Sequence, residues 1–234
     1  MVIDDPAPEP GVFGPLETLA AHAAGVLRRA RLHDDLEGAY LATVTALANA
    51  LEAKDADTHD HATETSHLAV AVGRRLGLRG DALRNLEFAA VLHDVGKIAI
   101  PDEILNRKGP LTDAEWTHVR DHTRIGERIL RDIPFLAPAA SAVRSAHERW
   151  DGAGYPDGLK GEDIPLASRI VFACDTWSVM TSERPYRAAL DGDEALRRLH
   201  EASGSQLDPS IVETLVSLLG DAGVAVRRRI PDAA

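Results

Sequence analysis

Hydrophobic and polar positions recur along most of this chain at the three-to-four-residue spacing of helices that bury one face. The pattern is clearest in the segments 16–54, 58–76 and 164–181. Gly77 and Gly80 predict the end of the second segment, because glycine readily adopts the left-handed conformation that closes a helix. Asp81 then predicts the N-cap of the next helix. The repeated helical spacing predicts an all-α fold.

Start signals and spacing predict further helices toward the C-terminus. Thr112 and Glu115 form a capping box before a helix that contains His122. Another helix is expected over 139–147, and two short helices are expected after residue 191. Between them, residues 150–165 hold several glycines and prolines and predict a long ordered loop, which makes that loop a candidate for function.

Composition divides the chain into four parts. Residues 1–15 contain four prolines and predict a flexible arm. Residues 16–54 predict a connector helix, although Gly25 and Gly38 weaken the case for one uninterrupted helix. This helix either packs on its own chain or pairs with its copy in a homodimer. Residues 55–220 predict the main domain, and residues 221–234 predict a charged tail.

The net charge limits the classes of partner that the chain can bind, and the cysteine content indicates its compartment. The formal net charge of −11 disfavours binding to nucleic-acid polymers and to anionic membranes, but a small anionic nucleotide can still bind where metals dominate the local field. Cys174 is the single cysteine, which excludes an internal disulfide framework and suits a reducing compartment. No apolar run of membrane-spanning length is present. A cytoplasmic protein is therefore expected.

Histidines and aspartates recur at nearly even intervals around an adjacent His-Asp pair. Successive candidate ligands are separated by 25 to 32 residues, at His61, His93, His122, His147 and Asp175. Two antiparallel helices with short loops need roughly 25 to 35 residues, so a bundle can bring these positions to one interior site. Imidazole and carboxylate together suit Mn, Fe or similar divalent ions, whereas closed structural zinc sites more often use thiolates.

The motifs HDVGK at 93–97 and HERWDGAGYPDG at 147–158 resemble the HD-GYP family, a branch of the HD superfamily of metal-dependent phosphohydrolases. The resemblance runs from about Leu36 to Leu218. It implies an HD-domain helical bundle with an N-terminal connector helix. It also implies a phosphodiesterase that hydrolyses cyclic di-GMP to pGpG, with GMP left open as a further product, through a metal-activated hydroxide.

The resemblance also implies residue roles. Asp94 is expected to bridge two divalent ions, Fe or Mn, with His61, His93 and Asp175 on one ion and His122 and His147 on the other. Asp94 and Lys97 are the expected catalytic residues. The expected substrate contacts are Lys97, Tyr155, Pro156, Arg184 and Arg187.

Three positions leave alternatives open. Ala146 stands where the family usually has a second histidine, and Ser178 stands where it often has an aspartate. Asp57 could bind a third metal or could cap a helix. The alternative functions are an HD phosphohydrolase acting on another nucleotide or phosphoester, and a catalytically degenerate protein that binds cyclic dinucleotides.

Overall fold

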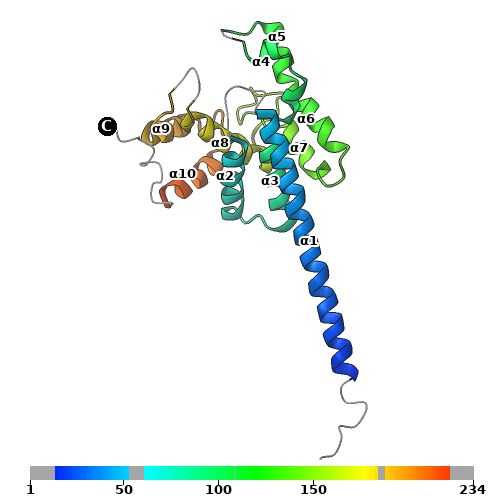
Figure 1. Cartoon of the computed structure of the whole chain (residues 1–234). Coiled ribbons are helices and arrows are strands. Elements are labelled where there is room, and N and C mark those ends of the chain that lie inside the picture. The colour runs from blue at the N-terminus through cyan, green and yellow to red at the C-terminus, as the bar shows by residue number, and fades with distance from the viewer. Residues whose placement is uncertain (1–13, 53–60, 108, 184–187, 222–234) are drawn as a thin grey trace, which may run out of the picture. The chain divides into compact units, whose positions relative to one another are not determined.

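The computed structural model describes residues 14–52, 61–107, 109–183 and 188–221. Within these ranges every regular element is a helix, and one isolated bridge joins Ser203 to Leu207 (Figure 1). The expectation of an all-α fold is confirmed. None of the described helices has the length and apolar content that a bilayer crossing requires.

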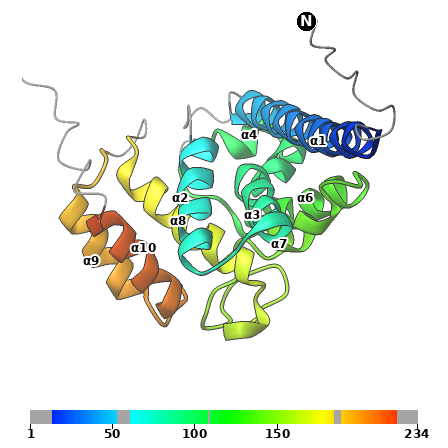
Figure 2. The same ribbon diagram turned by 90° about the horizontal axis from the view of Figure 1, so that it is seen from below.

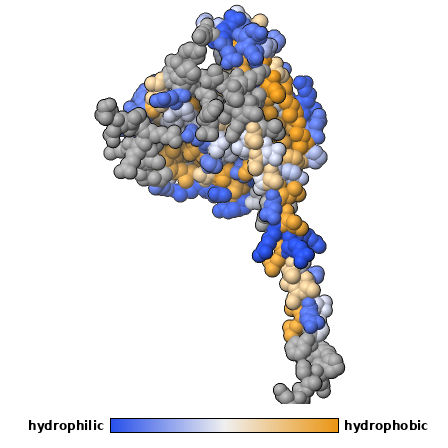
Figure 3. All heavy atoms as spheres, viewed as in Figure 1, coloured by the Kyte–Doolittle hydropathy of each residue, from blue (hydrophilic) through white to orange (hydrophobic). Residues whose placement is uncertain are grey.

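The chain separates into two compact units, residues 1–43 and 44–234. Helix α1 (Gly14–Glu52) runs without a break through Gly25 and Gly38, and nothing lies within 4 Å of a side-chain carbon added at either glycine. In the first unit, large apolar side chains of this helix reach the surface (Figure 3). They include Leu19 and Leu27, which are 64% and 61% exposed.

The second unit holds the remaining elements. They are α2 (His61–Arg75), α3 (Gly80–Leu92), η1 (Val95–Ala99), α4 (Asp102–Leu105), α5 (Asp113–Arg120), α6 (His122–Arg131), η2 (Ala137–Ala139), α7 (Ala140–Arg144), η3 (Gly161–Asp163), α8 (Leu166–Thr181), α9 (Gly192–Ala202) and α10 (Pro209–Asp221).

Helix α2 forms the centre of this unit and packs against α3, α8 and α10 (Figure 2). Its buried face is built largely from small residues, among them Ala62 and Ala69. Gly73 allows the closest approach, because a side-chain carbon there would lie 2.5 Å from Leu86 Cδ2. Small residues on α2 therefore bring α3 close enough for the ends of both helices to share one site.

A second group of packed elements lies beside the first, where α6 packs against η1 and α7. Gly96 of η1 meets the α6 backbone, since a side-chain carbon there would lie 1.9 Å from the carbonyl oxygen of His122. No larger residue fits at this position without moving one of the two elements. The glycine of HDVGK thus fixes the first turn of α6 against the residues that follow α3.

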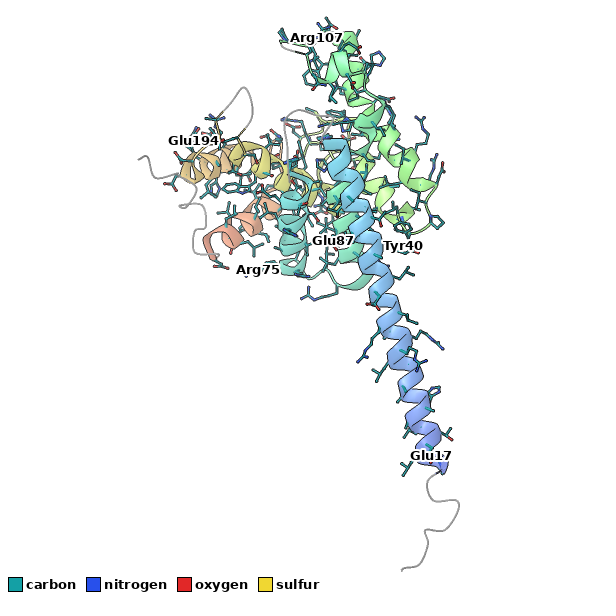
Figure 4. The ribbon with its side chains drawn as sticks, viewed as in Figure 1. Glu17, Tyr40, Arg75, Glu87, Arg107 and Glu194 are labelled. Atoms are coloured by element: carbon teal, nitrogen blue, oxygen red, sulfur yellow. The ribbon has the colours of Figure 1, made fainter. Side chains whose placement is uncertain are left out.

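The C-terminal helices are tied to the core by a buried ion pair. Arg169 of α8 donates to Asp208 Oδ2 at 2.7 Å, and Asp208 Oδ1 accepts from the Ser210 amide at the start of α10. At the other end of α10, Arg75 of α2 pairs with Asp221 at 2.8 Å (Figure 4). Both ends of α10 are therefore fixed to the central helices.

Three helix boundaries differ from the sequence predictions. The capping box at Thr112 and Glu115 is confirmed, but that helix ends at Arg120 and a new one, α6, begins at His122. Helix α7 ends at Arg144, before His147. The predicted N-cap at Asp81 is wrong, because Arg79 occupies the cap position and Asp81 instead pairs with Arg84 at 2.7 Å.

Candidate metal centre

Six potential ligands meet inside the second unit, and five of them lie at or beyond the ends of helical elements. They are His61 at the start of α2, His93 just after α3, Asp94 just before η1, His122 at the start of α6, His147 beyond α7, and Asp175 within α8. The ends of several helices therefore meet at one place in this unit. Their ligand atoms form two clusters.

The first cluster consists of His61, His93 and Asp175, whose ligand atoms all lie within 4.8 Å of one another. His61 Nε2 lies 2.9 Å from Asp175 Oδ1, and His93 Nε2 lies 3.8 Å from the same oxygen. The other ring nitrogen of His61 lies 3.0 Å from the Ser178 hydroxyl. Hydrogen bonds within the protein thus hold His61 and Asp175 in place, while His93 Nε2 lies beside them without a hydrogen-bond partner among the described residues.

The second cluster consists of Asp94, His122 and His147, which satisfy the same distance limit. Asp94 Oδ1 lies 3.3 Å from His122 Nε2 and 3.8 Å from His147 Nε2. The other oxygen, Asp94 Oδ2, lies 3.4 Å from His93 Nε2 in the first cluster. The two oxygens of Asp94 thus face different clusters.

Four buried ligand atoms have no hydrogen-bond partner among the described residues: His93 Nε2, Asp94 Oδ1, His122 Nε2 and His147 Nε2. Buried polar atoms are rarely left unpaired in a folded protein unless an ion or water satisfies them. The Nδ1–H groups of His93 and His122 donate to the Ala90 and Val119 carbonyls at 2.8 and 2.5 Å. That leaves each Nε2 lone pair free for an ion, which is the usual arrangement of a metal-bound histidine.

The charge of Asp94 suits the same role. Burial opposes ionisation, but the positive charge of Lys97, assisted by the neighbouring imidazoles, holds the pKa of Asp94 well below its usual range. Lys97 Nζ lies 2.8 Å from Asp94 Oδ2, so the lysine is held beside the cluster. Asp94 is therefore an ionised carboxylate at neutral pH.

The neighbouring groups have matching protonation states. Burial lowers the pKa of His147 below its ordinary value, which keeps the ring neutral and able to donate a lone pair. Burial also opposes ionisation of Asp175, but the hydrogen bond from His61, assisted by the nearby imidazoles, lowers its pKa. Neutral imidazoles and ionised carboxylates are the donor set that divalent Fe or Mn binds. The residues present therefore fit a metal centre.

The loop that follows His147 is anchored by a residue that sequence reasoning missed. Glu148 is 2% exposed, and its carboxylate accepts hydrogen bonds from three successive backbone amides, at positions 157, 158 and 159. Gly154 closes the loop on itself, because a side-chain carbon there would lie 2.3 Å from the Arg149 nitrogen. The sequence signal that could have identified Glu148 is an acidic residue that directly follows a candidate ligand and precedes a glycine-rich loop. The backbone amides of such a loop need a hydrogen-bond acceptor.

This loop places Tyr155 against the candidate ligand His147 and Pro156 against α6. The Tyr155 ring stacks on His147, with centroids 5.3 Å apart and planes at 23°. Burial, assisted by the Asp94 charge, raises the pKa of Tyr155 to about 12, so its hydroxyl stays protonated. The Pro156 carbonyl accepts from Arg124 Nη2 at 2.9 Å, which ties the loop to α6.

The two residues that depart from the family pattern, Ala146 and Ser178, are both buried. Ala146 is 1% exposed, and its methyl group offers no ligand atom. Ser178 is equally buried and lies between His61 Nδ1 and Glu64 Oε2, at 3.0 and 3.5 Å. The other expected residues, Asp57, Arg184 and Arg187, lie outside the described residues.

Comparison with known proteins identifies the class to which this fold and site belong. The HD domain family matches residues 45–211, so the chain belongs to that family. The membership expected from the HDVGK and GYP motifs is confirmed. A solved structure, that of the cyclic GMP-AMP specific phosphodiesterase V-cGAP3 of Vibrio cholerae, shares the fold with a TM-score of 0.61 at 22% identity, covering 76% of this chain and 48% of that chain.

Two curated relatives are more similar in sequence. The cyclic di-GMP phosphodiesterase response regulator RpfG of Xanthomonas campestris is 42% identical over 176 residues, which cover 74% of this chain and 47% of the relative. The 3'3'-cGAMP-specific phosphodiesterase 3 of Vibrio cholerae is 34% identical over 191 residues, covering 81% of this chain and 42% of the relative. The chain thus spans about half the length, or less, of these relatives.

Proposed function

We propose that this chain is a metal-dependent phosphodiesterase that opens cyclic di-GMP to the linear dinucleotide pGpG, with GMP as a further product to be tested. The observation that carries the proposal is the position of Asp94, whose two oxygens face two clusters of buried imidazoles and carboxylate. The substrate follows from the name of the relative at 42% identity.

Two divalent ions, Fe or Mn, are proposed as the cofactors. His61, His93 and Asp175 would hold one ion, His122 and His147 the other, and Asp94 both. Paired ions of this kind lower the pKa of a water molecule and neutralise the phosphodiester. A third ion at Asp57 remains part of the proposal.

The chain's own residues would bind and orient the substrate. Lys97, held at 2.8 Å by Asp94, supplies a positive charge beside the reacting phosphate. Tyr155 and Pro156 form the edge of the site, because Glu148 fixes the backbone of their loop. Arg184 and Arg187 are proposed as further substrate contacts, since guanidinium groups bind both phosphate and guanine edges well.

A homodimer through α1 is proposed as the assembly. The support is the row of exposed apolar residues along the first unit, including Leu16, Leu19, Val26 and Leu27. Light scattering of the chain and of a variant with Leu19 and Val26 changed to Ser tests it, and a monomer at micromolar concentration for both would contradict it. We also propose a cytoplasmic location, which the single cysteine of the chain, Cys174, favours.

Hydrolysis by metal-loaded protein tests the proposed activity. The chain is purified without air or chelator, loaded with Mn or Fe, and incubated with cyclic di-GMP while the products are separated by chromatography. Elemental analysis of the same sample gives the identity and the number of ions per chain. Absence of linear product at full metal occupancy would contradict the proposal.

A second candidate substrate is 3'3'-cGAMP, because a relative at 34% identity bears that specificity in its name. A panel of cyclic dinucleotides, nucleotides and generic phosphodiesters distinguishes the candidates by their kcat/KM values. Calorimetry that shows tight binding of an intact cyclic dinucleotide would instead favour a binding protein without catalysis.

A further inference from the structure

Arg120, the last residue of α5, carries an exposed guanidinium group beside the metal centre. Its Cζ atom lies 5.8 Å from the ring centroid of Trp116 and 5.6 Å from that of Tyr155. Tyr155 in turn stacks on His147, and its ring centroid lies 6.3 Å from that of His122 in an edge-to-face arrangement. Arg120 is therefore separated from two candidate ligands by a single aromatic ring. Figure 1 shows that α5 leads directly into α6, which begins with one of those ligands.

The charge of Arg120 has no carboxylate partner within the described part of the chain, whereas nearby arginines do. Arg124, one turn further on, lies 3.6 Å from Asp121 and donates to the loop carbonyl of Pro156. Arg107, labelled in Figure 4, pairs with Glu115 on the other side of α5. Asp121 and Glu115 are thus already paired with other arginines.

Aromatic contacts orient the Arg120 guanidinium without satisfying it. Trp116 and Tyr155 attract the positive charge through their ring faces, but a ring accepts none of the in-plane N–H bonds of a guanidinium group. Trp116 is itself 43% exposed, so this edge of the site is open to solvent. Such a group is preorganised for an anion that accepts two parallel hydrogen bonds, and phosphate is the anion that best fits this geometry.

We propose that Arg120, oriented by Trp116 and Tyr155, binds the second phosphate of the cyclic dinucleotide, the one that is not cleaved. This inference rests on the proposed function. A cyclic dinucleotide has two phosphodiester groups, and only one can lie at the metal centre while the other keeps its full charge. On a chain with a net charge of −11, that second charge needs a local cation. Arg120 is thus a residue that distinguishes dinucleotides from simple phosphodiesters.

Two substrates separate this role from a structural one. Arg120→Gln keeps a planar side chain but removes the charge, and it is assayed with cyclic di-GMP and with bis(p-nitrophenyl) phosphate, which has one phosphate. We expect KM for cyclic di-GMP to rise about tenfold, as for the loss of one charge-assisted phosphate contact, with kcat nearly unchanged. The kcat/KM for the single-phosphate substrate should stay within about twofold. The KM difference should shrink as salt is raised.

Further variants serve as controls. Arg128→Gln removes an exposed arginine from α6 and should leave both substrates unaffected. Arg120→Lys keeps the charge without the planar fork and should raise KM for cyclic di-GMP less than Arg120→Gln does. Trp116→Leu should raise the same KM by a smaller factor, because the guanidinium keeps its contact with Tyr155.

Two results would overturn the inference. An equal loss of kcat/KM on both substrates would show that Arg120 acts only by positioning Tyr155 and His147. Unchanged kinetics on both substrates would show that it contacts neither. If wild-type protein hydrolyses neither substrate, the proposed function fails independently, and calorimetry then decides the inference. Equal affinity of wild type and Arg120→Gln for cyclic di-GMP would then contradict it.

Discussion

The two ligand clusters use similar side chains but are held in different ways. In the first cluster, His61 is already bonded to Asp175 at 2.9 Å and has Ser178 at 3.0 Å on its other nitrogen. In the second, Asp94 Oδ1 lies 3.3 and 3.8 Å from the nearest nitrogens of His122 and His147, and none of these atoms has a hydrogen bond. In the first cluster only His93 Nε2 lacks a hydrogen-bond partner among the described residues, whereas in the second all three of these atoms lack one.

This difference predicts how each cluster responds to a cation. Leaving a buried polar atom unsatisfied costs about 1–3 kcal/mol. An ion that enters the second cluster relieves that cost, whereas an ion that enters the first must displace the His61–Asp175 hydrogen bond and its proton. We therefore expect ion binding at the second cluster to contribute more to folding stability than ion binding at the first.

The largest expected effect comes from Asp94→Asn, which removes the carboxylate that faces both clusters. The amide is neutral and binds divalent ions poorly, so both ions should be lost or displaced. Two-ion stabilisation of a phosphodiester supplies several kcal/mol, so hydrolysis of cyclic di-GMP should fall about a thousandfold or more. Kinetics and elemental analysis check it, with Asp193→Asn on the exposed turn of α9 as the control. Full metal content with normal rate would show that Asp94 is not shared.

Metal removal should lower the stability of the whole second unit. A ligand that binds only the folded state at a hundred times its dissociation constant stabilises that state by about 2.7 kcal/mol. Dialysis against chelator should therefore lower Tm by several degrees, and titration with Mn should restore it. Calorimetry of wild type, and of His122→Leu in parallel, measures how much of the gain belongs to the second cluster. An identical gain in both proteins would contradict the assignment of the gain to that cluster.

The clearest contrast is expected in metal-free protein. His61→Leu leaves buried Asp175 without its imidazole partner, and the free energy of unfolding should fall by about 1–3 kcal/mol. His122→Leu removes an Nε2 atom that had no partner and a single hydrogen bond, from Nδ1 to the Val119 carbonyl, so the free energy of unfolding should fall by less than it does in His61→Leu. Urea denaturation in chelator measures both. Equal losses in the two variants would show that the clusters do not differ as the hydrogen bonds indicate.

Spacing in the sequence, together with the family motifs, selected the ligands that the structure brings together. Intervals of 25 to 32 residues return the chain to the same place after each helical hairpin, and His61, His93, His122, His147 and Asp175 do meet. The division into two clusters also follows the pairing expected from the family resemblance. What the spacing could not give is the hydrogen bonding that makes the clusters unequal, because that depends on side-chain orientation.

Residues outside the spacing pattern were not found from the sequence. Glu148 is important because three loop amides turn toward it, and only the folded loop brings those amides together. Arg120 carries no periodic or motif signal, and its place beside Tyr155 depends on the break between α5 and α6 at Asp121. The periodicity predicted one continuous helix there. The role of Glu148 depends on how its own loop folds back, and that of Arg120 depends on a contact with a loop 35 residues further along the chain.

The smallest effect tests the one hydrogen bond that stands where the family often has a carboxylate. When His61 Nε2 binds an ion, its Nδ1–H must donate, and Ser178 Oγ at 3.0 Å is placed to accept while it donates in turn toward Glu64. Groups that orient a metal-bound histidine in this way change metal affinity about 10- to 100-fold when removed. Because a hydroxyl is neutral, we expect Ser178→Ala to weaken the first ion about tenfold and to leave the second unchanged. Metal titration followed by calorimetry separates the two sites, with Ser141→Ala on the exposed face of α7 as the control. If Ser178→Ala lowers the affinity for both ions equally, the Ser178 hydrogen bond does not act on the first cluster alone, and the two clusters are coupled through Asp94.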